Sequence, residues 1–240
     1  MSLSSSVISL SLVLMAAGCA AAPGTRPHDM SMASHEAAAT RADQSATVGG
    51  QPNPSGESRP CLVADGCWTR TASERPAEVQ QQRELAAKHR AAAAALGQAE
   101  AQACSGISAD NRDMSPFFHR EDVASVRPLS REVRQGKNIV HEDRGATVVF
   151  RAIPGLTAEW LQREIDCHIA RAASVGHDMP EMSYCPIVLK GVTAKVSTVR
   201  GGFAVAIESE DPDTKNEILR RSNALLPTGA AAESRTFPPQ

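Results

Sequence analysis

Residues 145–226 carry the most regular hydrophobic patterning in the chain, and this patterning limits the folds open to it. Residues 146–153 are rich in β-branched and aromatic side chains on both sides of the backbone, which predicts a strand covered on both faces. Thr157 is a good N-cap for the segment that follows, whose apolar residues recur at helical spacing. Gly176 is a suitable stop for that helix.

The second half of this stretch predicts two more strands and a last helix. Residues 192–199 and 203–207 read as strands joined by a short glycine-containing hairpin loop. Asp211 caps the final helix, with Pro212 at its first position and Pro227 as its stop. The order β-α-β-β-α predicts an α+β domain over most of a ferredoxin-like split β-α-β unit without its final strand. We therefore expect a three-stranded antiparallel sheet with two helices on one face.

A sheet with helices on only one face needs a cover on the other face. Residues 74–103 form the longest helical pattern, dense in Ala, Gln, Glu, Arg and Lys, within a region 61–140 that reads as mostly helical or connecting. One narrow seam follows steps of four and three along it: Leu85, His89, Ala92, Leu96, Ala99 and Ala103. This helix is the expected cover, and a homodimer or a protein partner bound through the seam is the alternative.

The N-terminal region predicts export. Residues 1–18 include an apolar run, which ends in Ala-Ala-Gly before Cys19 and is similar to the lipobox of a bacterial lipoprotein signal. The run lacks a basic n-region, so a plain secretory signal with an incidental Cys19 remains the alternative. Residues 19–60 and 227–240 lack an apolar period, so we expect a disordered linker and a disordered tail.

Six cysteines in an exported chain predict disulfides. Cys61 and Cys67 flank a short turn and are expected to pair with each other. Cys167 lies on the first helix of the α+β stretch, and the loop that carries Cys185 returns along that helix. A bond between those two is the expected pairing, with two free thiols as an alternative.

A metal site is a further alternative for the same loop. Imidazole, thioether and thiol groups gather there, and they are the ligands that copper and zinc accept. The candidate ligands are His168, His177, Met179, Met182 and Cys185. Since neighbouring residues on a helix diverge by about 100°, Cys167 and His168 are not expected to bind one ion together. A second His-Asp-Met triplet begins at His28, with His35 nearby; such a segment is more often a solvated linker.

The remaining features of the sequence exclude classes of function rather than identify one. The net charge of -2 and the absence of a basic stripe argue against nucleic-acid binding. The sequence contains no nucleophile elbow, phosphate-binding loop, His-Glu-x-x-His or Cys-x-x-Cys motif, so we expect no catalytic residue and no cofactor. A non-enzymatic structural or interaction module is the expected function, and a periplasmic copper-like metal binder is the alternative.

Three runs of sequence carry a resemblance: MSPFFHRED, GATVVFRAIPGLTAEWLQREIDCHIARAASVGHDMPEMSYCP and DPDTKNEILRRSNAL. They are similar to a recurring type of exported bacterial protein that often begins with a lipoprotein signal and to which no activity is assigned. The resemblance spans residues 74–226. It implies a location in the bacterial cell envelope and adds no site residue.

Overall fold

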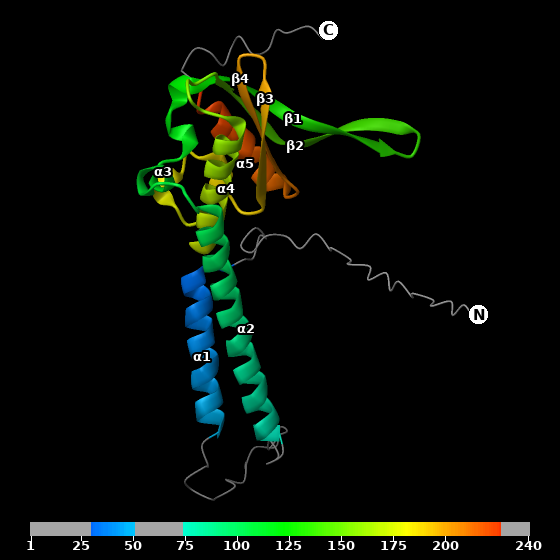
Figure 1. Cartoon of the computed structure of the whole chain (residues 1–240). Helices are drawn as coiled ribbons and strands as arrows, with labels where there is room; N and C mark the ends of the chain where they lie inside the picture. Colours follow the sequence, from blue (N-terminus) through cyan, green and yellow to red (C-terminus); the bar gives the residue numbers. More distant parts are fainter. Residues whose placement is uncertain (1–29, 51–73, 227–240) are drawn as a thin grey trace, which may run out of the picture.

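The computed structural model describes residues 30–50 and 74–226. The helices are α1 (Met32–Gly50), α2 (Glu74–Ala103), α3 (Ala109–Asp113), α4 (Ala158–Ser174) and α5 (Pro212–Asn223). Short 3-10 turns are η1 (Pro116–Phe118), η2 (Arg120–Asp122), η3 (Pro180–Met182) and η4 (Pro186–Val188). The strands are β1 (Val123–Gln135), β2 (Asn138–Arg151), β3 (Val192–Val199) and β4 (Gly202–Ser209). Together they form a mixed α+β fold (Figure 1).

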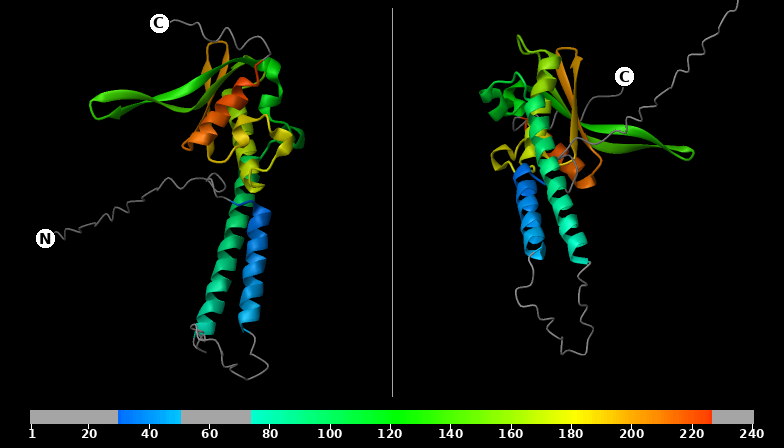
Figure 2. Two further views of the ribbon diagram at one scale, coloured as in Figure 1. Left: turned by 180° about the vertical axis from the view of Figure 1, so that it is seen from behind. Right: turned by 60° about the horizontal axis from the view of Figure 1, so that its bottom comes forward.

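The strands form one antiparallel sheet in the order β1-β2-β4-β3. Two long hairpins extend from the body that this sheet makes with α4 and α5. The helical hairpin of α1 and α2 runs away from the sheet, and the outer half of the β1–β2 hairpin projects in another direction (Figure 2). The protein is therefore a small α+β body with two projections.

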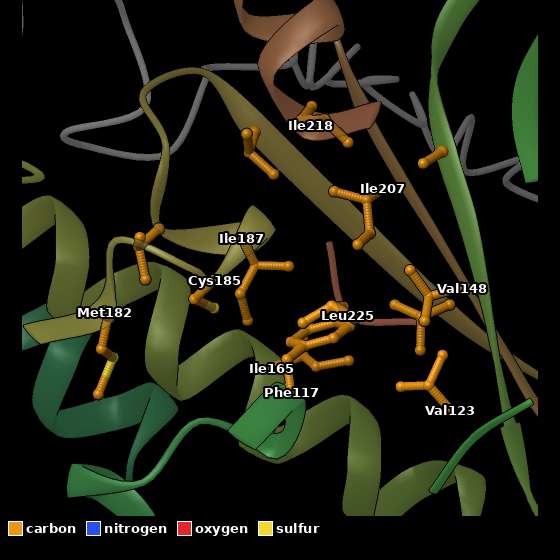
Figure 3. Close-up of a cluster of buried hydrophobic side chains, with 14 of the residues drawn as sticks. Phe117, Val123, Val148, Ile165, Met182, Cys185, Ile187, Ile207, Ile218 and Leu225 are labelled. Atoms are coloured by element: carbon orange, nitrogen blue, oxygen red, sulfur yellow. The ribbon is translucent and has the colours of Figure 1, made fainter. Parts of the chain in front are cut away.

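The core lies between one face of the sheet and the helices α4 and α5. Val148 on β2 and Val205 and Ile207 on β4 are fully buried, as are Ile165 on α4 and Ile218 on α5. Four of these five side chains are labelled in Figure 3, where they converge with residues of the preceding turns. Burying each such side chain contributes about 1.5–3 kcal/mol, so this layer supplies most of the stability of the body.

The second face of the sheet is not covered by α2, and the prediction that the long helix covers it is wrong. α2 packs mainly against α1 and α4. The side chains of Thr147, Val149, Lys195 and Ser197, which alternate with the core positions, are half-buried or exposed. Because most residues on this face are small or polar, they can face water without a second layer.

The prediction of three strands is also wrong, because β1 adds a fourth at the edge. The sequence predicts a partly helical connector over residues 123–135, where the structure has β1, and β2 begins at Asn138, well before its expected start at residue 146. The outer halves of both strands are almost entirely exposed. Without a buried face they carry no apolar alternation, which is the signal that marks a strand in a sequence. The predicted order β-α-β-β-α matches β2-α4-β3-β4-α5.

The β1–β2 hairpin leaves the sheet at Gly145, where β2 pairs with both β1 and β4. Gly145 has a φ of 148°, and a Cβ placed there would lie 2.2 Å from the carbonyl oxygen of Ile207. The β1–β2 ladder also shifts register between Leu129 and Ser130. Only glycine tolerates so close a backbone approach, which fixes the point where the hairpin turns away from the body.

α1 corrects the prediction of a disordered linker over residues 19–60. It packs along α2 through small side chains, with Ala39, Ala42 and Ala46 buried. Alanine is the best helix former but gives a weak hydrophobic period, so the sequence pattern did not separate this helix from a linker. None of the described helices combines the length and the apolar character that a membrane crossing requires.

The face of α2 that contacts α1 shares His89 and Leu96 with the predicted seam, but Ala86 and Ala93 take the places of Leu85 and Ala92. Ala86, Ala93 and Leu96 are buried there, His89 is half-buried, and Leu85 is 43% exposed. In a run of alanines, neighbouring helix faces have the same apolar spacing, so the pattern left the register open. α1 of the same chain therefore packs on part of the surface that the sequence predicts for a homodimer or a protein partner, and that partner stays a prediction.

Several expectations fall on residues outside those that the structure describes. They are the signal over residues 1–18 with Cys19, the His-Asp-Met triplet at His28, the Cys61–Cys67 pair and the tail over residues 227–240. These stay predictions.

Candidate functional site

The cysteine–histidine pair on α4 is the centre of the site that the sequence singled out. Cys167 is bonded to Cys104, which follows the last residue of α2, and their Cα atoms lie 4.6 Å apart. Cys185 is a free, buried thiol. The expected Cys167–Cys185 bond is therefore wrong: Cys167 packs with Cys104 and Ile107 in a small cluster, whereas Cys185 belongs to the main core.

His168, the next residue on α4, holds the segment around α3. Its side chain is fully buried, and Nε2 donates to the carbonyl oxygens of Asn111 (3.1 Å) and Met114 (3.0 Å). Nδ1 is buried and has no hydrogen-bond partner among the described residues. The imidazole therefore acts as a neutral donor that fixes the backbone of residues 111–114.

Two arginines on α4 extend the same arrangement. Arg163 donates to the carbonyl oxygen of Ser105 at 2.6 Å. Arg171 donates to the carbonyl oxygen of Arg112 at 2.8 Å and forms an ion pair with Asp113. The hydrogen bond from Arg171, together with its charge, holds the pKa of Asp113 below its usual range. We call Arg163, Cys167, His168 and Arg171 the clasp, because all four hold residues 104–114 against α4.

A hollow of about 580 Å³ lies beside the clasp, at the meeting point of α1, α2, α3 and α4. Its charged lining residues are Glu100, Arg112, Asp113 and Arg171, two acidic and two basic. Arg171 and Asp113 already pair with each other. The hollow therefore presents no field of one sign that would favour a charged ligand.

The Cys185 thiol has low reactivity in this fold. It is fully buried beside Ile187 (Figure 3), and its Sγ lies 3.1 Å from the hydroxyl of Ser115. Burial raises the pKa of the Cys185 thiol to about 11. The thiolate, which is the form that binds metals and attacks electrophiles, is therefore scarce at neutral pH.

The other candidate metal ligands form hydrogen bonds with the backbone or pack in the core. His177 has a positive φ of 62°, and its Nδ1 donates to the carbonyl oxygen of Val188 at 2.8 Å. Met179 and Met182 are buried in the core cluster. The structure therefore does not bring together, among the described residues, the copper or zinc ligands that the sequence offered as an alternative.

Within residues 30–50 and 74–226, a single group brings three His, Cys, Asp or Glu ligand atoms together, and it consists of His119, Glu121 and Asp122. His119 and Glu121 are exposed, and their side chains contact each other at 3.1 Å. Exposed acidic groups of this kind are common on protein surfaces, so the group identifies no site.

The clasp predicts a pH dependence of stability. Burial, with a smaller contribution from the Arg171 charge, lowers the pKa of His168 below its ordinary 6.5. The folded protein therefore keeps this imidazole neutral at a pH where the unfolded chain protonates it, so the unfolded state binds more protons. The free energy of unfolding should fall as the pH drops below 6.5, by up to about 1.4 kcal/mol per pH unit for one proton.

Urea unfolding at pH 7.5, 6.5 and 5.5 measures this slope. The His168→Gln variant should show a slope smaller by one proton, whereas His141→Gln, at an exposed position on β2, should keep the wild-type slope. Equal slopes in the wild type and in His168→Gln would contradict the assignment.

Sequence reasoning missed Cys104, Arg163 and Arg171 in this site. The one available signal was the odd number of cysteines left after Cys19 and the local pair are set aside, which requires one free thiol but does not say which. Comparisons of the chain with protein-family models, with curated proteins and with solved structures found no match.

Proposed function

We propose that this protein is an exported, lipid-anchored, non-enzymatic interaction module of the bacterial cell envelope. The observation that carries the proposal is the Cys104–Cys167 disulfide, which ties the helical hairpin to the α+β body. Structural disulfides persist in oxidising compartments outside the cytoplasm. The leader ending at Cys19 supports the same location and adds a lipid anchor as the membrane partner.

The β1–β2 hairpin is the element that we propose makes the contact. Its outer strands pair with each other, and the backbone pairing of β2 with β4 ends at Gly145, beyond which Arg144 reaches Glu208 of β4 through its side chain. Ile139 near its tip is 65% exposed. Basic side chains outnumber acidic ones over residues 127–144, which gives the hairpin a slightly positive surface. An element that buries so little of its own surface adds little to folding, so contact with another protein is the role that fits it best.

Two finer statements belong to the same proposal. A non-enzymatic role is supported by the clasp and by Cys185, whose reactive groups are committed to structure. A ferredoxin-like arrangement is supported by β2 and β3, which run in the same direction with β4 between them and with α4 as the crossover. In that arrangement β1, which precedes β2 in the chain, takes the place of the fourth strand.

One set of cells tests the anchor and the contact together. The full chain and its Cys19→Ser variant would each carry a photo-crosslinking residue at Ile139 or, as a matched exposed control, at Phe118. We expect a palmitate analogue to label only the chain that keeps Cys19, and irradiation to give a discrete adduct from position 139 and none from position 118.

Each result decides one part of the proposal. Equal labelling of the Cys19→Ser chain would contradict the lipid anchor. A lack of any adduct specific to position 139 would contradict the contact role of the β1–β2 hairpin. An adduct of twice the chain mass would identify the partner as a second copy.

A further inference from the structure

A histidine pair, separate from the clasp residues, joins the two helices of the helical hairpin. His35 on α1 and His89 on α2 approach with their Nδ1 atoms 2.9 Å apart. Their ring centroids lie 5.2 Å apart, and the ring planes are inclined by 46°. The rings therefore meet head-on through their Nδ1 edges. Both residues are half-buried, so water reaches the site from one side.

The histidine pair lies in a contact surface between α1 and α2 that includes small apolar side chains. The nearby contact surface between α1 and α2 includes the fully or nearly buried alanines Ala39, Ala42 and Ala86. An ion pair between Asp43 and Arg90 also links these helices. Small side chains bury little apolar area, so this hairpin is weakly held, and any ligand that joins the two rings would tighten it.

We propose that His35 and His89 form a two-imidazole site for a borderline divalent transition metal, such as Cu²⁺ or Zn²⁺, that crosslinks α1 to α2. This inference is independent of the proposed function, because it concerns a different projection and needs neither export nor a partner.

The observed spacing fits the chemistry of such ions. Metal–nitrogen bonds of about 2.0–2.1 Å place two adjacent imidazole nitrogens about 2.9 Å apart at a right angle and about 3.3 Å apart at a tetrahedral angle. Since the rings meet head-on, each ring would turn by roughly 45° to point its Nδ1 at one shared ion while the two nitrogens stay near 2.9 Å apart. Binding replaces the proton between the two nitrogens, so it requires both imidazoles to be neutral and weakens in acid.

The remaining coordination positions would be filled by water. No third His, Cys, Asp or Glu ligand atom joins this pair among the residues that the structure describes. Two protein ligands on separate helices still make a chelate, because the fold holds both nitrogens in place before the ion arrives. Cu²⁺ should bind more tightly than Zn²⁺, in the usual order for nitrogen ligands, and Mg²⁺ should not bind.

Metal titration of the oxidised full-length chain tests the proposal. We expect binding of Cu²⁺ at His35 and His89, with a Cu²⁺ electron paramagnetic resonance spectrum that contains two coupled imidazole nitrogens. His35→Gln and His89→Gln should each weaken this binding at least tenfold, and the double variant should be no worse than either single variant. That pattern is expected because one remaining imidazole binds Cu²⁺ no more tightly than any exposed histidine does.

Two control variants and one measurement without substitutions make the test decisive. His119→Gln removes the imidazole from the other candidate ligand group, and His141→Gln removes an exposed one; neither should change the affinity for Cu²⁺ at this site. In the wild type, Zn²⁺ should protect His35 and His89, but not His141, from acylation by diethylpyrocarbonate. Affinity unchanged in His89→Gln, a loss in His119→Gln alone, or equal acylation of all three histidines with and without Zn²⁺ would overturn the proposal.

Discussion

Removing the Cys104–Cys167 disulfide with the double substitution Cys104→Ala/Cys167→Ala should lower the free energy of unfolding by about 4 kcal/mol. The bond joins residues 63 positions apart, so its loss frees a long loop in the unfolded chain. It also removes both sulfurs from a small buried cluster with Ile107, against which Trp160 packs. Urea unfolding under non-reducing conditions measures the change.

A reductant provides the matched control for this prediction. Dithiothreitol should lower the unfolding midpoint of the wild type toward that of the double variant. Any shift that it still causes in the double variant must come from cysteines elsewhere in the chain. A wild-type midpoint that does not respond to the reductant would contradict the role given to this bond.

The substitution Phe117→Ala should cost about 3–5 kcal/mol, the range typical of a buried phenylalanine. Phe117 is fully buried in the core, and its ring lies 5.4 Å from that of Phe150 on β2, centroid to centroid. It anchors the turn before β1, so its loss would leave a cavity where this edge strand joins the body. The same urea measurement applies.

Phe118, the next residue, is a closely matched control. Its side chain is 58% exposed, with edge contacts to His119 and Tyr184. Phe118→Ala should therefore change the free energy of unfolding by no more than about 1 kcal/mol. Equal costs for the two substitutions would show that η1 is not anchored through Phe117.

The part of the fold that sequence predicted best is the part whose signals are local. Thr157 and Asp211 cap α4 and α5 as expected, with side chains that accept from the backbone amides of Trp160 and Thr214. The strands β3 and β4 follow their apolar alternation. Caps and alternation need only a few neighbouring residues, so they can be read without knowledge of the tertiary fold.

The parts that sequence missed are those stabilised by distant residues or exposed to water. β1 has mostly exposed side chains and is held by its pairing with β2. α1 depends on α2 for the burial of its alanines. Neither situation leaves a hydrophobic period in the local sequence, and both elements had been given to a linker or a connector.

The sequence predicted how the side chains of the candidate site diverge around α4, but not which residues they contact. The divergence of Cys167 and His168 around α4 follows from helix geometry alone, and the structure confirms that they take different partners. That Cys104 rather than Cys185 is bonded to Cys167 depends on where α2 ends in space. Spacing along the chain contains no such information, because cysteine pairing is set by the tertiary fold.

Disulfide mapping of the protein from the periplasm tests the clasp most directly. Trypsin places Cys104, Cys167 and Cys185 on separate peptides, residues 91–112, 164–171 and 172–190. After alkylation in denaturant without a reductant, the digest should contain peptide 91–112 linked to 164–171, with Cys185 alkylated on 172–190. A peptide linking Cys167 to Cys185, or alkylated Cys104 and Cys167, would contradict the clasp as the structure that joins the helical hairpin to the body.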